Sequence, residues 1–242
     1  MNRVVAYLTM HSLLGRRRAI WLALLPALLL LLAVLVRVMA GIDEHQSATL
    51  LDGFALGTVV PLLGLIAGTG AIGPEIDDGS IVYLLAKPVN RHSIVISKLT
   101  VAIGAVVVFA AVPTFGAGLI LAGTRANLAA GYAVAAAVAG IAYCALFLLL
   151  AILTRTAVVI GLLYAVVWEG VVGGFVPGAQ SLSVRQWALT LTARVVGPRA
   201  AELGVTPAVS LVPGTIALAA LVVLSTWYAG ARLKVLRLAS DD

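Results

Sequence analysis

Three glycines with the spacing G-x-G-x-x-G are the first feature of the chain that suggests chemistry. They lie in G-L-I-A-G-T-G-A-I-G-P-E-I-D-D-G, residues 64–79. In a dinucleotide-binding domain such glycines join a strand to a helix whose amino terminus faces a pyrophosphate, and an acid follows about 20 residues later. Here Pro74 follows the third glycine, and the later position is Ser93. The G-K dipeptide of a phosphate-binding loop, G-x-x-x-x-G-K-S/T, is also absent. We therefore predict that this chain itself binds no nucleotide and no other cofactor.

Composition indicates the environment in which these glycines lie. Of the 242 residues, 62% are hydrophobic and 11% are charged, whereas a soluble domain is about half apolar and a quarter charged. The chain has too few polar residues to cover a surface in water. The lipid bilayer is therefore its expected solvent.

Six apolar runs are long enough to cross a bilayer, since a helix needs roughly 20 apolar residues to span about 30 Å of hydrocarbon. They are residues 19–40, 53–72, 99–122, 128–153, 157–176 and 208–230. The sequence predicts an all-α membrane protein with one six-span domain, 19–242, after a short segment, 1–18. The first run is longer than the core of a secretory signal and five more follow it, so we interpret it as a retained span rather than a cleaved signal.

The positions of Lys and Arg predict the orientation, because short cytoplasmic loops are enriched in them. Most lie on the side that holds both ends of a six-span chain: Arg3, Arg16, Arg17, Arg18, Lys87, Arg91, Lys98, Arg155, Arg232, Lys234 and Arg237. The opposite side has Arg37, Arg125, Arg185, Arg194 and Arg199, offset by Asp43, Glu44, Asp52 and Glu202. Both termini are therefore predicted to be cytoplasmic, in a cell membrane. This topology explains the net charge of +6 without a nucleic-acid partner.

The loop between the second and third spans, residues 73–98, has a distinctive pattern. We expect Gly64 and Gly68 to let two helices approach closely and the Gly73-Pro74 pair to end the span. Pro at a first helical position followed by acids predicts a short helix from Pro74 to about Ala86. The run I-V-Y-L-L-A at 81–86 is too apolar for a solvated loop. Either this helix folds back on the membrane or it docks into another protein.

This loop resembles the one between spans two and three of ABC-2 type permeases, the membrane subunits of one class of ATP-binding-cassette transporters. The matching positions are Glu75, Gly79, Leu84, Leu85, Pro88, Val89, Arg91, Ile94 and Lys98. The six-span plan extends the resemblance over the chain. In that family the loop forms a coupling helix that lies in a cleft of the ATPase subunit.

The resemblance implies roles for individual residues. Polar contacts to the ATPase would come from Glu75, Asp77 and Asp78, and the apolar contacts that fill its cleft from Ile76, Tyr83 and Leu84. Pro88 and Arg91 would fix the entry into span three, while Gly79 and Leu85 complete the pattern. The resemblance also implies that two copies of a separate ABC ATPase subunit bind ATP and Mg, and that a second permease copy or a related chain completes the pathway.

Two further segments fit the same family plan. Residues Val4, Tyr7, Leu8, His11 and Leu14 share one helical face, which predicts an interfacial helix before the first span. Between spans five and six, residues 177–207 are too polar to span, yet Val184, Trp187, Leu191 and Val195 repeat at helical spacing. We expect a short external helix there. Either helix could instead lie passively on the lipid.

Glu169 is the one acid within a predicted span, roughly 18 Å from its start at 1.5 Å per residue. Such carboxylates line a pathway, carry protons or pair with a charge, and Arg37 is a possible partner. No metal site is predicted, because His11, His45 and His92 lie in separate segments. The function we predict is a permease subunit, an exporter rather than an enzyme. An intramembrane enzyme would need a second catalytic group near Glu169, and a channel or structural subunit is the other alternative.

Overall fold

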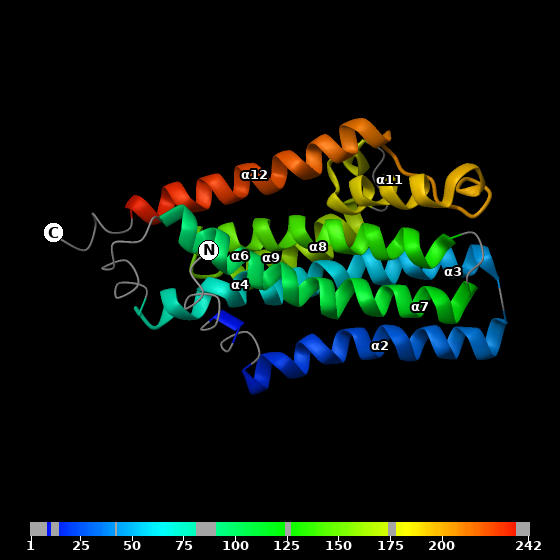
Figure 1. The fold of residues 1–242 in the computed structure, drawn as a ribbon, viewed down its shortest axis with the longest axis horizontal. Coiled ribbons are helices and arrows are strands. Elements are labelled where there is room, and N and C mark those ends of the chain that lie inside the picture. The colour runs from blue at the N-terminus through cyan, green and yellow to red at the C-terminus, as the bar shows by residue number, and fades with distance from the viewer. Residues whose placement is uncertain are drawn as a thin grey trace.

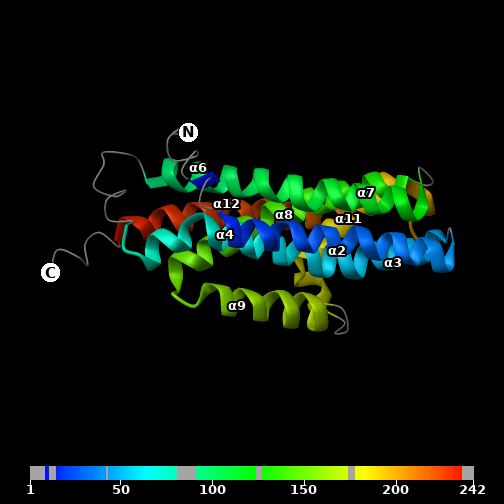
Figure 2. The ribbon, with the colours of Figure 1, turned by 90° about the horizontal axis from the view of Figure 1, so that it is seen from below.

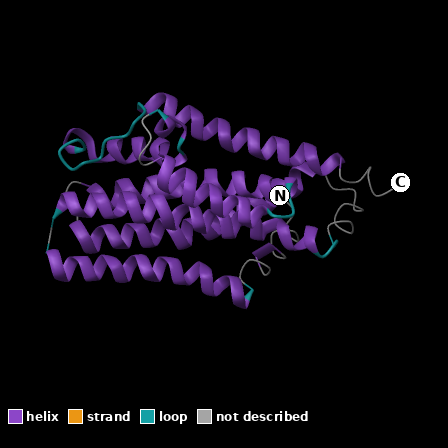
Figure 3. Ribbon diagram, turned by 180° about the vertical axis from the view of Figure 1, so that it is seen from behind, coloured by secondary structure: helices purple, strands orange, loops and turns teal. Residues whose placement is uncertain are grey.

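The protein is a bundle of long helices. The computed structural model describes residues 9–10, 15–41, 43–80, 91–123, 127–173 and 178–235. Helices are the only regular structure within these ranges (Figure 3). Five helices are long and apolar enough to cross a membrane, namely Ala19–Met39, Glu44–Ile76, Arg91–Ala122, Leu128–Leu153 and Leu211–Leu233. The expected all-α membrane fold is thus confirmed, with five clear spans.

Several spans are built from more than one helical segment. In chain order, the elements are α2 (Arg16–Ala40), α3 (Glu44–Leu50), η1 (Leu51–Val59), α4 (Val60–Asp77), α6 (Arg91–Val106), η2 (Val107–Ala111), α7 (Val112–Ala122), α8 (Leu128–Leu153), α9 (Ala157–Leu163), η4 (Tyr164–Val172), η5 (Ala179–Leu182), α11 (Val184–Val196), η6 (Gly197–Arg199) and α12 (Leu211–Val235). The segments η1, η2 and η4 have π-helical geometry, in which each turn closes an i→i+5 hydrogen bond. The segments α3, η1 and α4 follow one another directly and make one rod.

Helix α8 lies at the centre of the bundle and packs against α4, α7, α11 and α12 (Figure 1). Small residues make this possible, because a Cβ on Gly64 would lie 2.5 Å from Tyr143 Cβ and one on Gly68 would lie 2.8 Å from the Cys144 carbonyl. Without side chains at these two positions, α4 and α8 approach to backbone contact. The expected role of Gly64 and Gly68 is confirmed.

Two span boundaries differ from the sequence prediction. The second span begins at Glu44, not at residue 53, and its helix runs without a break through the Gly73-Pro74 pair to Asp77. The third span begins at Arg91, not at residue 99. The expected helix start at Pro74 is therefore wrong: Pro74 lies inside α4, and the acids that follow it occupy the last turn of that helix.

The fifth predicted span is shorter than expected. Its apolar helix covers Ala157–Val171, formed by α9 and η4, and lies at the edge of the bundle (Figure 2). Helix α11 then runs on in the same direction and packs against α8 and α12 (Figure 1). A helix is present where the apolar spacing predicts one, although Val195 of the expected face is exposed and Ala188 is fully buried. Its external location stays a prediction. We call the predicted fifth span, 157–176, the fifth crossing, and α11 the half-helix that follows it.

The helices at the bundle's edge keep apolar side chains on the outside. Exposed residues include Trp21, Leu31 and Met39 on α2 and Ile216 and Trp227 on α12. Such a surface fits hydrocarbon and not water. The start of α2 and the end of α12 lie at the same end of the bundle (Figure 1).

Candidate functional site

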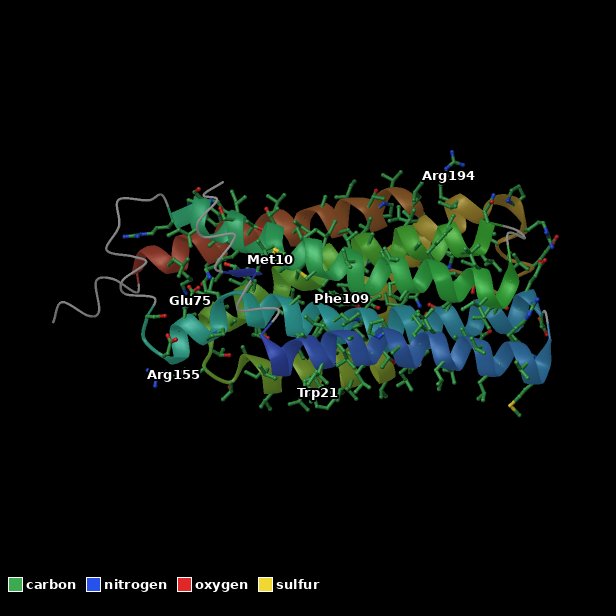
Figure 4. All side chains as sticks on the ribbon, turned by 60° about the horizontal axis from the view of Figure 1, so that its bottom comes forward. Met10, Trp21, Glu75, Phe109, Arg155 and Arg194 are labelled. Atoms are coloured by element: carbon green, nitrogen blue, oxygen red, sulfur yellow. The ribbon has the colours of Figure 1, made fainter. Side chains whose placement is uncertain are left out.

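Polar side chains gather in two places, one at each end of the bundle. We call the end where α4 finishes and α6 begins the loop end, and the opposite end the far end. Glu75 and Arg155 lie at the loop end, while Arg194 lies toward the far end (Figure 4). The rod formed by α3, η1 and α4 reaches both places, because it carries Asp52 near one end and Glu75 near the other.

At the loop end, Lys98 of α6 forms an ion pair with Glu75 of α4. The Lys98 Nζ lies 2.6 Å from Glu75 Oε1, and the lysine side chain is fully buried while that of Glu75 is 27% exposed. An ammonium group taken out of water is costly unless it is paired. The pair therefore fixes the end of α4 against the start of α6, the two helices that flank the loop.

Lys98 also binds the backbone of α4 one turn before Glu75. Its Nζ donates to the Ala71 carbonyl at 2.7 Å, and at 3.5 Å to the Thr9 hydroxyl. Proline lacks the N–H that would extend the helical ladder, and neighbouring groups must satisfy the carbonyls near it.

The remaining loop residues with predicted roles lie in different surroundings. Asp78 follows the last residue of α4 as its C-cap. Its carboxylate accepts from the Ser80 N–H at 2.9 Å, while Gly79 has the left-handed φ of 74°. The hydrogen bonds from Ser80 lower the pKa of the exposed Asp78. Ile76 packs against the core. The Arg91 Nη1 and Glu75 Oε2 atoms are buried and have no hydrogen-bond partner within the described ranges.

Part of the predicted coupling segment lies beyond these contacts. Tyr83, Leu84, Leu85 and Pro88 are outside the described residues, as is the side chain of Asp77. The expected interfacial helix over residues 2–14 also lies outside them, except for the helical residues Thr9 and Met10. The assignments of these residues to ATPase contacts stay predictions.

At the far end, Arg185 of α11 binds Asp52 of η1 with both arms of its guanidinium group. Its Nε donates to Asp52 Oδ1 at 2.9 Å and its Nη2 to Oδ2, while the side chains are 13% and 23% exposed. This fork geometry is the strongest form of a side-chain ion pair. Asp52, counted in the sequence as a loop charge, instead lies within the second span.

Glu169 of η4 is fully buried and caps α11. Its carboxylate accepts from the Tyr164 hydroxyl at 3.0 Å, the Ser183 hydroxyl at 2.5 Å, the Val184 N–H at 3.0 Å and the Arg185 N–H at 3.3 Å. A helix amino terminus carries unpaired N–H groups and a partial positive charge. The negatively charged Glu169 of η4 therefore binds η4 to the amino terminus of α11.

The expected pairing of Glu169 with Arg37 is wrong. Arg37 donates instead to the Leu121 carbonyl at 3.2 Å, near the end of α7. The four donors around Glu169 all belong to this chain and use the acceptor positions of its carboxylate. This argues for a structural role rather than a direct contact with a transported molecule.

The sequence held weak signals for the residues that it failed to single out. Ser183 precedes the apolar spacing of α11 and accepts from the Gln186 N–H, a common amino-terminal cap. Lys98 and Glu75 both belong to the loop pattern, but nothing in the sequence indicated that they pair across 23 residues. Arg185 gave no local signal, since its partner lies 133 residues away. Within the described ranges, no group of three His, Cys, Asp or Glu side chains could hold a metal ion.

Comparison with known proteins identifies the family. A family model described as "ABC-2 family transporter protein" matches residues 14–193, from the start of α2 to the last turn of α11. No curated protein matches the chain. The matched region includes both polar clusters and the loop between α4 and α6. With its membrane-spanning helices, this chain is a multi-pass membrane protein that belongs to the ABC-2 transporter family.

Proposed function

We propose that this chain is the permease subunit of an exporter, driven by ATP hydrolysis in a separate ATPase that docks on the segment between α4 and α6. Family membership supports a transport subunit with an ABC ATPase partner. The observation that carries the docking site is the buried Glu75–Lys98 pair, because it joins the two helices that flank this segment. A force applied there would move α4 and α6 together.

The proposed assembly contains two permease chains and two ATPase subunits, with ATP and Mg bound by the ATPases. Nucleotide-driven closure of the ATPases would favour one packing of the spans over the other, which is how a ligand shifts a two-state equilibrium. The excess of Lys and Arg at the loop end supports a cytoplasmic location for that end, in a cell membrane.

Asp78 offers the cleanest test of the docking site, because it is exposed and ends α4. The permease would be purified with the ATPase encoded beside it, if that neighbour carries G-x-x-x-x-G-K-S/T. We expect Asp78→Lys to lower the recovered ATPase by about fivefold or more, since reversed charge at an interface opposes association. Glu202→Lys, at an exposed far-end residue, is the matched control and should recover the normal amount.

Two results would contradict the proposal. One is an ATPase yield from Asp78→Lys equal to that from Glu202→Lys. The other is a reconstituted complex in which ATP drives no transport across a panel of amphiphilic dyes, lipids and peptides. Association without ATP-dependent transport would instead favour a channel or a structural subunit.

A further inference from the structure

Arg185 connects three segments at the far end. Its guanidinium group binds Asp52 in η1, and its backbone N–H donates to Glu169 in η4 at 3.3 Å. It is also the second residue of α11. The start of this half-helix is therefore tied to the second crossing by a side chain and to the fifth crossing by its backbone.

The surroundings of the guanidinium group are shaped to receive it. A Cβ at Gly57 would lie 3.3 Å from Arg185 Nη1 and 3.6 Å from its Cδ, so a glycine five residues after Asp52 leaves room for the arginine against η1. Both side chains are mostly buried, where an ion pair is screened less than at a surface. This site holds the arginine by shape and charge together.

A second ion pair at the same end provides a contrast. Arg199 of η6 binds Glu44 of α3 at 3.0 Å, but the arginine side chain is 55% exposed. Exposed pairs contribute little because water screens them and their long side chains lose entropy. The Asp52–Arg185 pair should therefore control the position of α11, while Arg199–Glu44 should not.

Both anchors of this connection lie in π-helical segments. Asp52 lies in η1 and Glu169 in η4. A change from i→i+5 to i→i+4 bonding alters the turn, so it rotates the residues on either side about the helix axis. Such a rotation in η1 would turn Asp52 away from Arg185. Because Asp52 and Glu75 lie on one rod, motion at the loop end can reach this contact.

We propose that Arg185 is a positioning residue for transport: its bond to Asp52 latches α11 to the second crossing and keeps the far end closed, and each transport step releases it. This inference rests on the proposed function, in which ATP drives the change of packing. The structure in hand has the latch closed. Glu169 stays bound to the amino terminus of α11 throughout, so α11 moves with η4.

Chemical labelling of Ala188→Cys tests the latch. Ala188 lies on α11 and is fully buried, and the lone Cys144, also fully buried, would be replaced by Ala. The full chain with its ATPase would be placed in lipid nanodiscs and treated with a bulky maleimide. We expect Arg185→Gln and Asp52→Asn to raise the labelling rate about tenfold without nucleotide, since each removes one member of a shielded pair. Arg199→Gln is the matched control and should label at the parent rate.

Charge exchange separates release of the latch from damage to the fold. The double variant D52R/R185D restores opposite charges and should return labelling toward the parent rate, and Arg185→Lys, which keeps the charge without the fork, should be intermediate. The latch is wrong if Arg185→Gln labels like Arg199→Gln. The latch is equally wrong if Arg185→Gln raises labelling and lowers the melting temperature, and D52R/R185D restores neither the parent labelling rate nor the parent melting temperature.

The same preparation separates this inference from the proposed function. If the parent complex shows no ATP-dependent transport, the proposed function fails whatever the labelling shows. If the parent complex transports, and ATP raises its labelling to the rate of Arg185→Gln, the proposed function and the latch are both supported. If the parent transports and ATP leaves labelling unchanged, the latch alone is wrong.

Discussion

The two polar clusters solve the problem of burying charge in different ways. At the loop end, one lysine serves a carboxylate and a carbonyl, and Glu75 Oε2 is buried without a partner among the described residues. At the far end, Glu169 accepts four hydrogen bonds and Asp52 accepts both arms of an arginine. A carboxylate with all its acceptor positions used, such as Glu169, holds one arrangement firmly, whereas a partly satisfied carboxylate such as Glu75 is held less firmly. The loop end is thus suited to moving against a partner, and the Glu169 cap to staying intact.

The largest expected loss of stability comes from removing the Glu169 carboxylate. Glu169→Ala removes the acceptor for two backbone N–H groups and two hydroxyls, and buried donors without partners are costly. We expect the free energy of unfolding in mixed micelles to fall by about 3 kcal/mol or more.

The exposed Arg199–Glu44 ion pair supplies the control for Glu169→Ala. Glu44→Ala removes the partner of Arg199 and should cost less than about 1 kcal/mol. Equal losses for Glu169→Ala and Glu44→Ala would show that the cap contributes no more than a surface contact, and the contrast between the clusters would disappear.

A middle-sized effect is expected where α4 packs on α8, because this contact holds the rod that links the clusters. Gly68→Ala would place a Cβ 2.8 Å from the Cys144 carbonyl and 3.0 Å from Phe147 Cβ, and overpacking of this kind costs about 1–3 kcal/mol. Gly104→Ala is the matched control, since a Cβ there meets nothing within 4 Å, and better helix propensity should add about 0.5–1 kcal/mol. Thermal unfolding in detergent would compare them, and a stabilised Gly68→Ala protein would contradict the close packing.

The smallest effect is expected at Asp78, which is exposed. Hydrogen bonds from Ser80 lower its pKa, so any stability that it contributes is present above the pKa of the unfolded chain and is lost as pH falls through the lowered value. Asp78→Asn should therefore be at most slightly less stable than the parent at neutral pH, and this difference should disappear in acid, where the Asp78 carboxyl is protonated and uncharged like the amide. A clear difference in melting temperature at pH 7 would show that Asp78 holds the fold and would weaken it as a docking residue.

The sequence predicted the parts of the fold that the solvent determines. Five of the six expected spans are long apolar helices, because hydrocarbon tolerates little else. The predicted span boundaries were wrong where charged side chains form ion pairs. Asp52 and Lys98 were assigned to loops since an unpaired charge ends a span, yet each has its partner on another helix. The Gly73-Pro74 pair also misled the prediction, because α4 runs through it to Asp77.

The candidate site residues were likewise predictable, but their contacts with other helices were not. Glu169 was identified from its residue type and its depth in the predicted span. Its partners were not predicted, because Ser183 and the Val184 N–H lie 14 and 15 residues further along the chain, on another helix. The carried-over loop positions were tied to a family pattern, and that family is confirmed by the match over residues 14–193. What they contact in the ATPase stays a prediction.

The central claim is that motion enters at the Glu75–Lys98 pair and releases α11 at the far end. The most direct measurement is ATP-dependent labelling of Ala188→Cys in the nanodisc complex, with Lys98 intact or changed to Met, which fills similar volume without charge. We expect ATP to raise labelling with Lys98 intact, and we expect Lys98→Met, still bound to its ATPase and hydrolysing ATP, to lose this rise. An undiminished rise in Lys98→Met would contradict it.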